Sequence, residues 1–376
     1  MAIVFTKDLL NTKLYTAYNN NIIDFYSDET SPAVKVTITI VLNVITLYPS
    51  PSGLFNYNFK ELITTILNTD NFADDLEIDI DTNFVYDWTD KVSLNQNIVF
   101  EITKQDATLI SVTKDITWLS AYVNLRDYKR TYPSQELLVN DIAVLQKTSV
   151  DNYYKYKVTY WLGYPFGLTL WLNSQDLTIT NETNLVDYTF TGNDKVDRLI
   201  FSDGRSDFSI ANIIPLADGF NNLNFNDIFN LELHTPYTQC SDGVYLKYIN
   251  SFGGWSYWLF NKGNEDTKTK DKGSLFNDYN NLEDTTSPLI SLGKESSNTI
   301  QVQERNVNED FKNQLTDLID SPKVYLFTGL RFSKNTFNDW MEVVINDGSF
   351  RIENSRTNLY TFNFKIELPP NVTRTL

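Results

Sequence analysis

The amino-acid sequence predicts a mainly β protein with two or more antiparallel β-sandwich or barrel domains and two amphipathic helices. Short segments that alternate apolar and polar residues recur about every 8–12 residues, which is the spacing typical of all-β folds. Aromatic residues make up 14% of the 376 residues, whereas Gly (14) and Pro (11) are sparse. A chain of this length is long for one hydrophobic core, so we expect several domains.

The densest apolar stretch is Cys240–Phe260, and we expect the rest of the chain to be organised around it. Residues 244–249 alternate in the manner of a strand. Gly253 and Gly254 then permit a positive φ, and a second strand rich in aromatic residues follows. Aromatic side chains on both faces predict a hairpin inside a core or at a contact between subunits. The residues expected to form this core or assembly hairpin are Tyr245, Tyr248, Gly253, Gly254, Trp255, Trp258 and Phe260.

The first 130 residues are expected to form an arm and one domain. Residues 1–31 are polar and rich in asparagine, which predicts an N-terminal arm that becomes ordered against a neighbour. A first β-rich domain is expected over residues 32–130, beginning with a strand at Val34–Tyr48. It contains a helix at Phe59–Phe72, whose apolar residues follow helical spacing. A further alternating strand is expected at Leu76–Trp88.

Two more β-rich domains are expected in the remaining chain. The second domain covers residues 131–215, where short strands are separated by turn residues. The third covers residues 216–376 and carries the second amphipathic helix at 310–319. Residues 261–308 are mostly Asn, Asp, Lys, Ser and Thr, which predicts a long exposed loop or insertion.

The net charge of −17 limits the classes of partner. Phosphate binding relies on an excess of Lys and Arg, so this charge disfavours a sequence-independent grip on DNA. We also expect no sequence-specific nucleic acid as a partner. The longest apolar run, Val36–Tyr48, is too short and too rich in threonine to span a bilayer, so no membrane insertion is expected. A single cysteine excludes an internal disulfide framework.

One acidic stretch has part of the pattern of a calcium loop. Asp79, Asp81 and Asn83 supply oxygen atoms at the first three ligand positions. Phe84, however, stands where that loop requires glycine. The solvent-exposed face of an alternating strand is the simpler interpretation, with a calcium ion at a subunit contact as the alternative.

The sequence offers little for catalysis. His234 and Cys240 are each the only residue of their kind, and a pair six residues apart could act as base and nucleophile. Neither has an evident third residue to orient it, and a lone cysteine is usually a small buried hydrophobic residue. Tryptophans such as Trp161 and Trp171 could stack on sugars, but their positions in strand patterns favour a core role. We therefore predict no enzyme activity, no cofactor and no metal.

Two stretches resemble proteins of tailed bacteriophages and prophages that infect Bacteroidetes-type hosts. Residues 244–260, VYLKYINSFGGWSYWLF, are similar to a recurring YLKW-N--GGW-YWLF pattern, from which Tyr248 departs because tryptophan is more frequent there. Residues 53–62, GLFNYNFKEL, are similar to a second pattern, G-F-YNFKE. Together the two stretches cover under a tenth of the chain, and neither is catalytic.

The resemblance implies a virion structural protein of the tail, baseplate or neck, made in the host cytoplasm. Such proteins form rings through heterologous contacts, so the expected partners are copies of this chain, in a ring of roughly 6 or 12, and neighbouring tail or neck proteins. Arms and insertions would reach those neighbours, with Lys268, Lys270 and Lys272 available for ion pairs. The alternatives are a tail-tip adhesin that binds or cleaves host polysaccharide, and a surface sandwich domain without a viral role.

Overall fold

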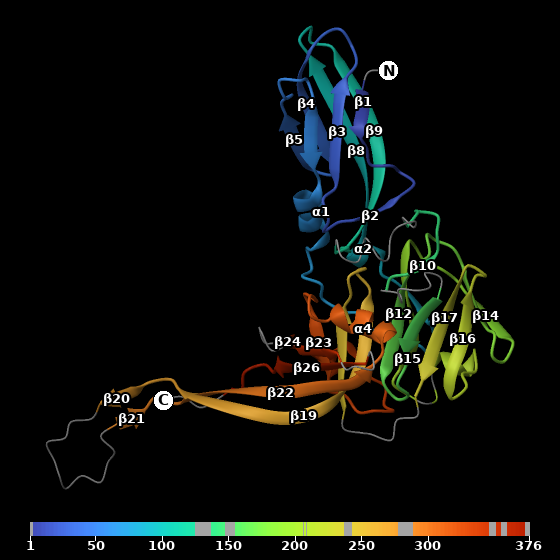
Figure 1. Ribbon diagram of the computed structural model, residues 1–376, viewed down its shortest axis with the longest axis vertical. Coiled ribbons are helices and arrows are strands. Elements are labelled where there is room, and N and C mark those ends of the chain that lie inside the picture. Colours follow the sequence, from blue (N-terminus) through green and yellow to red (C-terminus); the bar gives the residue numbers. More distant parts are fainter. Residues whose placement is uncertain are drawn as a thin grey trace.

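The computed structural model consists of three β-rich units and one long projecting ribbon (Figure 1). It describes residues 3–124, 137–146, 155–205, 207, 209–236, 243–276, 289–345, 351–354 and 359–372. The predicted fold class is confirmed, because antiparallel strands dominate and helices are few and short.

The first unit is a sandwich of two sheets. One sheet has the order β1 (Ile3–Lys7), β3 (Ile22–Ser27), β6 (Phe55–Asn58). The other has the order β2 (Leu14–Thr16), β9 (Leu109–Leu119), β8 (Ser93–Lys104), β4 (Ala33–Ile40), β5 (Asn43–Leu47). Phe25 from one sheet meets Phe100 from the other edge-to-face at 5.3 Å, so the two sheets share one aromatic core.

The N-terminal segment is not a separate arm, which corrects the expectation for residues 1–31. Strand β1 pairs with β3, and β3 pairs with β6, all antiparallel. Ile3, Ile23 and Phe25 are buried in the core of the first unit. The polar residues that suggested an arm alternate with these apolar ones, so a half-buried strand explains the composition.

Both predicted amphipathic helices are present but shorter than expected. The first, α1, covers Lys60–Leu67 and buries Ile63 and Leu67. The second, α4, covers Glu309–Thr316, and the side chain of Asn308 caps it by accepting a hydrogen bond from the backbone of Phe311. A further one-turn helix, α2 (Thr89–Val92), and two 3-10 turns, η1 (Ile210–Asn212) and η2 (Phe337–Asp339), complete the helical elements of the described chain.

The second unit contains two facing sheets. One sheet has the order β10 (Ala143–Val144), β12 (Pro165–Trp171), β15 (Val196–Asp203), β7 (Val85–Asp87). The other has the order β11 (Lys155–Thr159), β17 (Phe229–Thr235), β16 (Gly219–Phe225), β13 (Leu177–Asn181), β14 (Val186–Phe190).

These sheets correct two predicted boundaries. The division between residues 215 and 216 separates strands that pair in one sheet, because β16 pairs with β13. The predicted strand Leu76–Trp88 is mostly irregular, and only its end forms β7, which pairs with β15 of the second unit. The predicted boundary at residues 130 and 131 lies outside the described residues.

The third unit is a small closed barrel. Its strands are β18 (Gly243–Ile249), β19 (Trp255–Asp271), β22 (Lys294–Val307), β23 (Val324–Phe327), β24 (Trp340–Ile345), β25 (Arg351–Asn354) and β26 (Tyr360–Glu367). The sheet runs in the order β22, β19, β18, β23, β24, β26, β25, and an additional pairing of β22 with β26 closes it.

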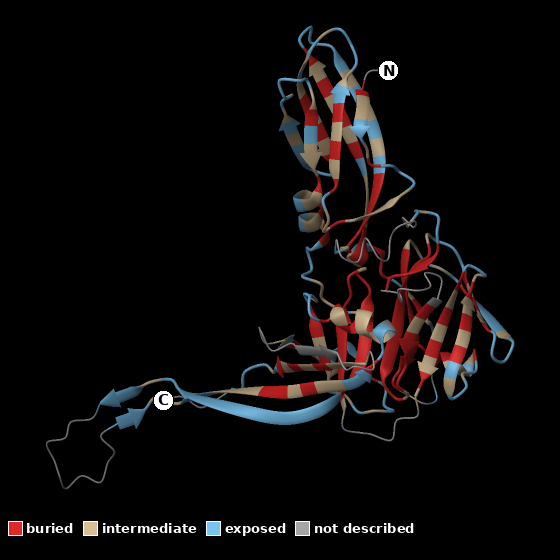
Figure 2. Cartoon of the chain, in the orientation of Figure 1, coloured by how far each residue is buried: buried red, intermediate tan, exposed pale blue. Residues whose placement is uncertain are grey.

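The described residues of 261–308 outside α4 form paired strands rather than a loop, which corrects the loop predicted there. Beyond the barrel, β19 and β22 continue as an antiparallel pair from Asp266 opposite Thr299 to Asp271 opposite Lys294. Two short strands, β20 (Ser274–Phe276) and β21 (Leu289–Ser291), pair farther out. Neither face of the ribbon meets a core, so both faces carry polar side chains (Figure 2). The sequence there therefore lacks the alternation of apolar and polar residues that predicts a strand.

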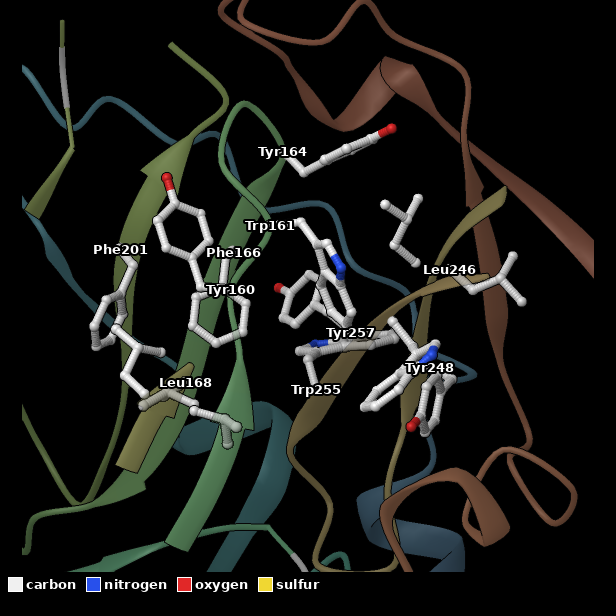
Figure 3. Packing of buried hydrophobic residues seen from close by; sticks show 14 of the residues in the cluster. Tyr160, Trp161, Tyr164, Phe166, Leu168, Phe201, Leu246, Tyr248, Trp255 and Tyr257 are labelled. Atoms are coloured by element: carbon white, nitrogen blue, oxygen red, sulfur yellow. The ribbon is translucent and has the colours of Figure 1, made fainter. Parts of the chain in front are cut away.

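The second and third units share one hydrophobic core, whereas the first unit has its own. Phe166 of the second unit contacts Tyr257 of the third, with ring centroids 5.5 Å apart (Figure 3). Trp161 of the second unit also contacts Trp258 of the third, with ring centroids 5.1 Å apart. A smaller cluster that includes Trp88, Leu119, Leu145 and Trp171 lies where the three units meet. The second and third units therefore form one body, and the first unit is attached to it through this smaller cluster.

Strands β18 and β19 form the predicted hairpin, which we call the central hairpin. Its turn lies where the three units meet. The backbone carbonyl of Ser251 accepts a hydrogen bond from the backbone N–H of Tyr122, at the end of the first unit. The side chain of Asn250 donates to the carbonyl of Leu145, in the second unit, at 3.0 Å. A β-carbon on Gly253, which has φ +83°, would lie 2.5 Å from the carbonyl oxygen of Ser120. Glycine is therefore required here both by conformation and by close packing.

We predict that Gly253→Ala lowers the free energy of unfolding by about 1–3 kcal/mol more than Gly53→Ala does. Both glycines have a positive φ, +83° and +79°, so the backbone strain is matched. Only Gly253 is packed against backbone, whereas a β-carbon on Gly53 would meet nothing within 4 Å. Chemical denaturation of the two variants measures the difference, and equal losses would contradict the close approach.

Candidate functional site

Three buried charged side chains meet between the units. Asp74 forms ion pairs with Arg198, at 2.7 Å from Nη1 to Oδ1, and with Lys247, at 2.6 Å from Nζ to Oδ2. The side chains of all three are at most 5% exposed. We call this group the charge junction.

Each residue of the charge junction comes from a different part of the fold. Asp74 lies in the segment that leads from α1 of the first unit to β7. Arg198 lies on β15 of the second unit and Lys247 on β18 of the barrel. We call the segment between α1 and β7 the entry segment. One carboxylate therefore connects the entry segment to the second unit and to the barrel.

Aromatic side chains surround the two cations. The guanidinium of Arg198 lies 4.7 Å from the ring of Trp88 and donates a hydrogen bond to the hydroxyl of Tyr257 at 3.2 Å. The ammonium of Lys247 lies 4.3 Å from the ring of Trp340 and 5.1 Å from that of Trp255. These cation–π contacts replace part of the hydration that burial removes.

The electrostatics of the charge junction follow from burial and opposed charges. Burial alone would raise the pKa of Asp74, but the attraction of Arg198 and Lys247 outweighs it and holds that pKa well below its usual range. Burial lowers the pKa of the Lys247 ammonium from 10.5 to about 8, while Asp74 opposes this shift and Arg198 adds to it. The stabilisation that ionised Asp74 contributes is therefore present at neutral pH and is lost only as the pH falls through the lowered pKa.

This geometry suits a structural role. Both carboxylate oxygens of Asp74 are bound by cations, so neither is available to take a proton from a substrate. Within the described ranges, no group of three or more His, Cys, Asp or Glu residues is arranged to hold a metal ion.

The stretch that resembles a calcium loop is occupied by ion pairs. Asp81 pairs with Arg205, at 2.7 Å, and Asp79 pairs with Lys334, at 3.2 Å. Asn83 accepts a hydrogen bond from the backbone of Val85. These residues belong to a turn and not to the solvent-exposed face of a strand, which corrects that interpretation.

Of the two residues considered for catalysis, the structure describes only His234. His234 is half-buried on β17 and stacks on the ring of Phe220, with centroids 4.5 Å apart. Burial lowers the pKa of the His234 imidazole, and the nearby Glu232 opposes that shift. Cys240 lies outside the described residues.

The residues predicted for the central hairpin lie in the interior. Strand β18 pairs with β19 from Gly243 opposite Asn261 to Ile249 opposite Trp255. One face of the hairpin turns toward the barrel interior, where Phe260 meets Phe364 at 5.2 Å. All seven are buried: Tyr245, Tyr248, Gly253, Gly254, Trp255, Trp258 and Phe260. The other face carries Tyr245 and Lys247 and meets the second unit and the charge junction.

The charge junction is absent from the sequence-based predictions. One signal for it exists, because Lys247 interrupts the apolar strand Val244–Ile249 between Leu246 and Tyr248. A lysine in such a context is rarely buried unless a carboxylate neutralises it. Sequence alone does not identify Asp74 as that carboxylate, since 173 positions separate the two residues.

The ribbon is a second candidate site, for contacts with other molecules. We define the ribbon as residues 262–276 and 289–298, and the ribbon tip as β20 and β21. Residues 262–271 of β19 are all exposed, and at about 3.3 Å per residue they extend roughly 30 Å. In the ribbon tip, Leu275 lies opposite Ile290 and Phe276 opposite Leu289, and all four side chains are exposed. Apolar side chains gathered at the end of a projecting element are typical of a contact surface.

We predict that Asp74→Asn lowers the free energy of unfolding by about 3–5 kcal/mol at neutral pH, because two cations are left buried without their carboxylate. The matched control is Asp75→Asn, which removes a neighbouring carboxylate that is 68% exposed and pairs with Lys91 at 3.5 Å. The control should cost at most about 1 kcal/mol. Urea denaturation monitored by tryptophan fluorescence compares them, and equal small losses would contradict the role of the charge junction.

Comparisons with known proteins do not assign the chain to a family. No family model matches it, and no curated protein is significantly similar to it. Among solved structures, fibronectin(III)-like modules of Clostridium thermocellum CbhA cover 62% of this chain and 94% of their own, with 7% identity and a TM-score of 0.20. A tetra-tandem repeat from the extending region of a large adhesion protein covers 80% of this chain and 70% of its own, with 13% identity and a TM-score of 0.22. At these TM-scores the similarity supports no inference about this chain.

Proposed function

We propose that the chain is a non-enzymatic structural protein whose copies assemble into a ring in the tail or head–tail junction of a bacteriophage. The observation that carries the assembly role is the ribbon, which projects from the barrel and ends in exposed apolar side chains (Figure 1). The viral setting rests on the resemblance of residues 53–62 and 244–260 to phage proteins. The position within the particle is part of the proposal.

The charge distribution favours the ribbon as a contact element. Copies that each carry a net charge of −17 repel one another over about 8–10 Å at physiological ionic strength. Residues 262–298 carry five lysines and seven Asp and Glu residues, a net charge of −2, so nearly all of the net negative charge of the chain lies outside them. A neighbouring acidic copy therefore repels this segment less than it repels the remainder of the chain.

The rigid body behind the ribbon also suits a structural role. The barrel and the second unit share one core, so force applied at the ribbon is transmitted into a single packed body. The charge junction and the glycine turn then connect that body to the first unit. An assembly built from such subunits would keep a defined geometry.

The alternative of a polysaccharide-binding adhesin receives less support from the described residues. Trp161 and Trp171, which we considered as a sugar-stacking platform, are buried in the cores. A platform for sugars requires exposed aromatic faces.

No helix in the described part of the chain is long and apolar enough to cross a membrane.

We predict that the protein forms oligomers that strengthen with added salt, because screening weakens acidic repulsion while apolar contacts persist. Sedimentation velocity across a salt and concentration series measures this. The control is a shortened variant in which Asp266 and Thr299, which lie opposite each other, are joined by Asn-Gly in place of residues 267–298. It should retain the thermal stability of the wild type and remain monomeric. A wild-type chain that stays monomeric at every salt and protein concentration would contradict the assembly role.

A further inference from the structure

We propose that the outer edge of strand β5 in the first unit binds the ribbon tip of a second copy of this chain. The inference rests on the proposed assembly function and names the two surfaces that meet. Strand β5 is the last strand of its sheet, and within the described residues it pairs only with β4. Its outward backbone N–H and C=O groups are therefore available to another strand.

The edge lacks the protection that exposed edge strands usually carry. Proteins commonly place lysine, proline or a bulge on such strands to prevent pairing with other chains. Residues 36–48 contain no charged residue and no proline. Leu42, Val44 and Tyr48 are 94, 65 and 73% exposed. An uncharged, exposed strand of this composition is a site for strand pairing.

The turn between β4 and β5 is also unusual. Ile40 lies opposite Asn43, so Val41 and Leu42 alone form the turn. Val41 has φ +53°, a conformation that a β-branched residue rarely adopts and that such turns normally assign to Gly or Asn. The chain thus places two exposed apolar residues where small polar ones would be less strained. Strain retained at an exposed apolar turn points to a contact made by these side chains.

The ribbon tip complements this edge in chemistry. Strands β20 and β21 are uncharged, and Leu275 and Ile290 present apolar side chains to solvent. Two uncharged surfaces are where acidic copies approach each other at the lowest electrostatic cost.

One chain does not bring its own two surfaces together. Strand β5 lies in the first unit, whereas β20 and β21 lie at the far end of the ribbon, which projects from the barrel in another direction (Figure 1). The contact must then join different copies head to tail. A heterologous contact of this kind produces a ring when its rotation closes and a filament when it does not.

The test uses single lysine substitutions that each block one surface. Val44→Lys blocks the β5 edge, and Leu275→Lys blocks the ribbon tip. Val344→Lys is the matched control, because Val344 is an exposed strand residue, 63% against 65% for Val44, outside both surfaces. Each blocking variant should raise the apparent dissociation constant by about 100-fold or more, since the contact would bury an unpaired charge. The control should assemble like the wild type.

Mixing the two blocking variants distinguishes this contact from others. An equimolar mixture retains one intact edge, on the Leu275→Lys copy, and one intact ribbon tip, on the Val44→Lys copy. We expect dimers that do not grow further, measured by mass photometry. A mixture that stays monomeric overturns the proposal, as does assembly of Leu275→Lys alone at the wild-type level, which would indicate pairing of two β5 edges instead.

The controls separate this inference from the proposed function. Circular dichroism spectra and melting temperatures of the variants should equal those of the wild type, because all three substituted side chains are exposed. If Val44→Lys does not fold, Leu42→Lys blocks the same surface from the turn. Failure of the wild type to assemble would defeat both proposals. Wild-type assembly that both blocking variants retain would defeat only the pairing of the β5 edge with the ribbon tip.

Discussion

The ion pairs of Asp74 with Arg198 and Lys247 hold the segment that leaves the first unit against the body formed by the second and third units. A buried ion pair contributes little net stability compared with an apolar group of the same shape, but removing one partner is costly. We infer that it contributes specificity, because a placement of the segment that moves Asp74 away would leave two buried cations without their carboxylate. The first unit has a separate core, so few other contacts fix its position.

The hairpin turn complements the charge junction on the same interface. Gly253 lets the backbone approach Ser120, and Asn250 binds the carbonyl of Leu145, so one turn touches all three units. Together these contacts hold the first unit on the barrel while the ribbon projects in another direction (Figure 1). A fixed separation of the β5 edge and the ribbon tip is what a head-to-tail assembly requires, because variable angles between contacts prevent closure of a ring.

The sequence predicted the elements that have local patterns and missed those that depend on distant partners. The central hairpin followed from alternation around Gly253 and Gly254, and both helices followed from their apolar spacing. The ribbon was missed because strands without a core lack that alternation, and the arm was misassigned because half-buried strands are partly polar. The charge junction was missed because Asp74 lies 124 positions from Arg198. The residues next to Asp74 in the sequence do not indicate that its carboxylate is buried.

The central claim is that the charge junction fixes the orientation of the first unit on the barrel. A direct measurement is the distance distribution between spin labels at Ser52 of the first unit and Leu330 of the third, with Cys240→Ser as background and unlabelled protein in excess. Both label sites are exposed. The account predicts one narrow distribution in the wild type and a broad one in Asp74→Asn. A broad distribution in the wild type, or an unchanged narrow one in Asp74→Asn, would contradict it.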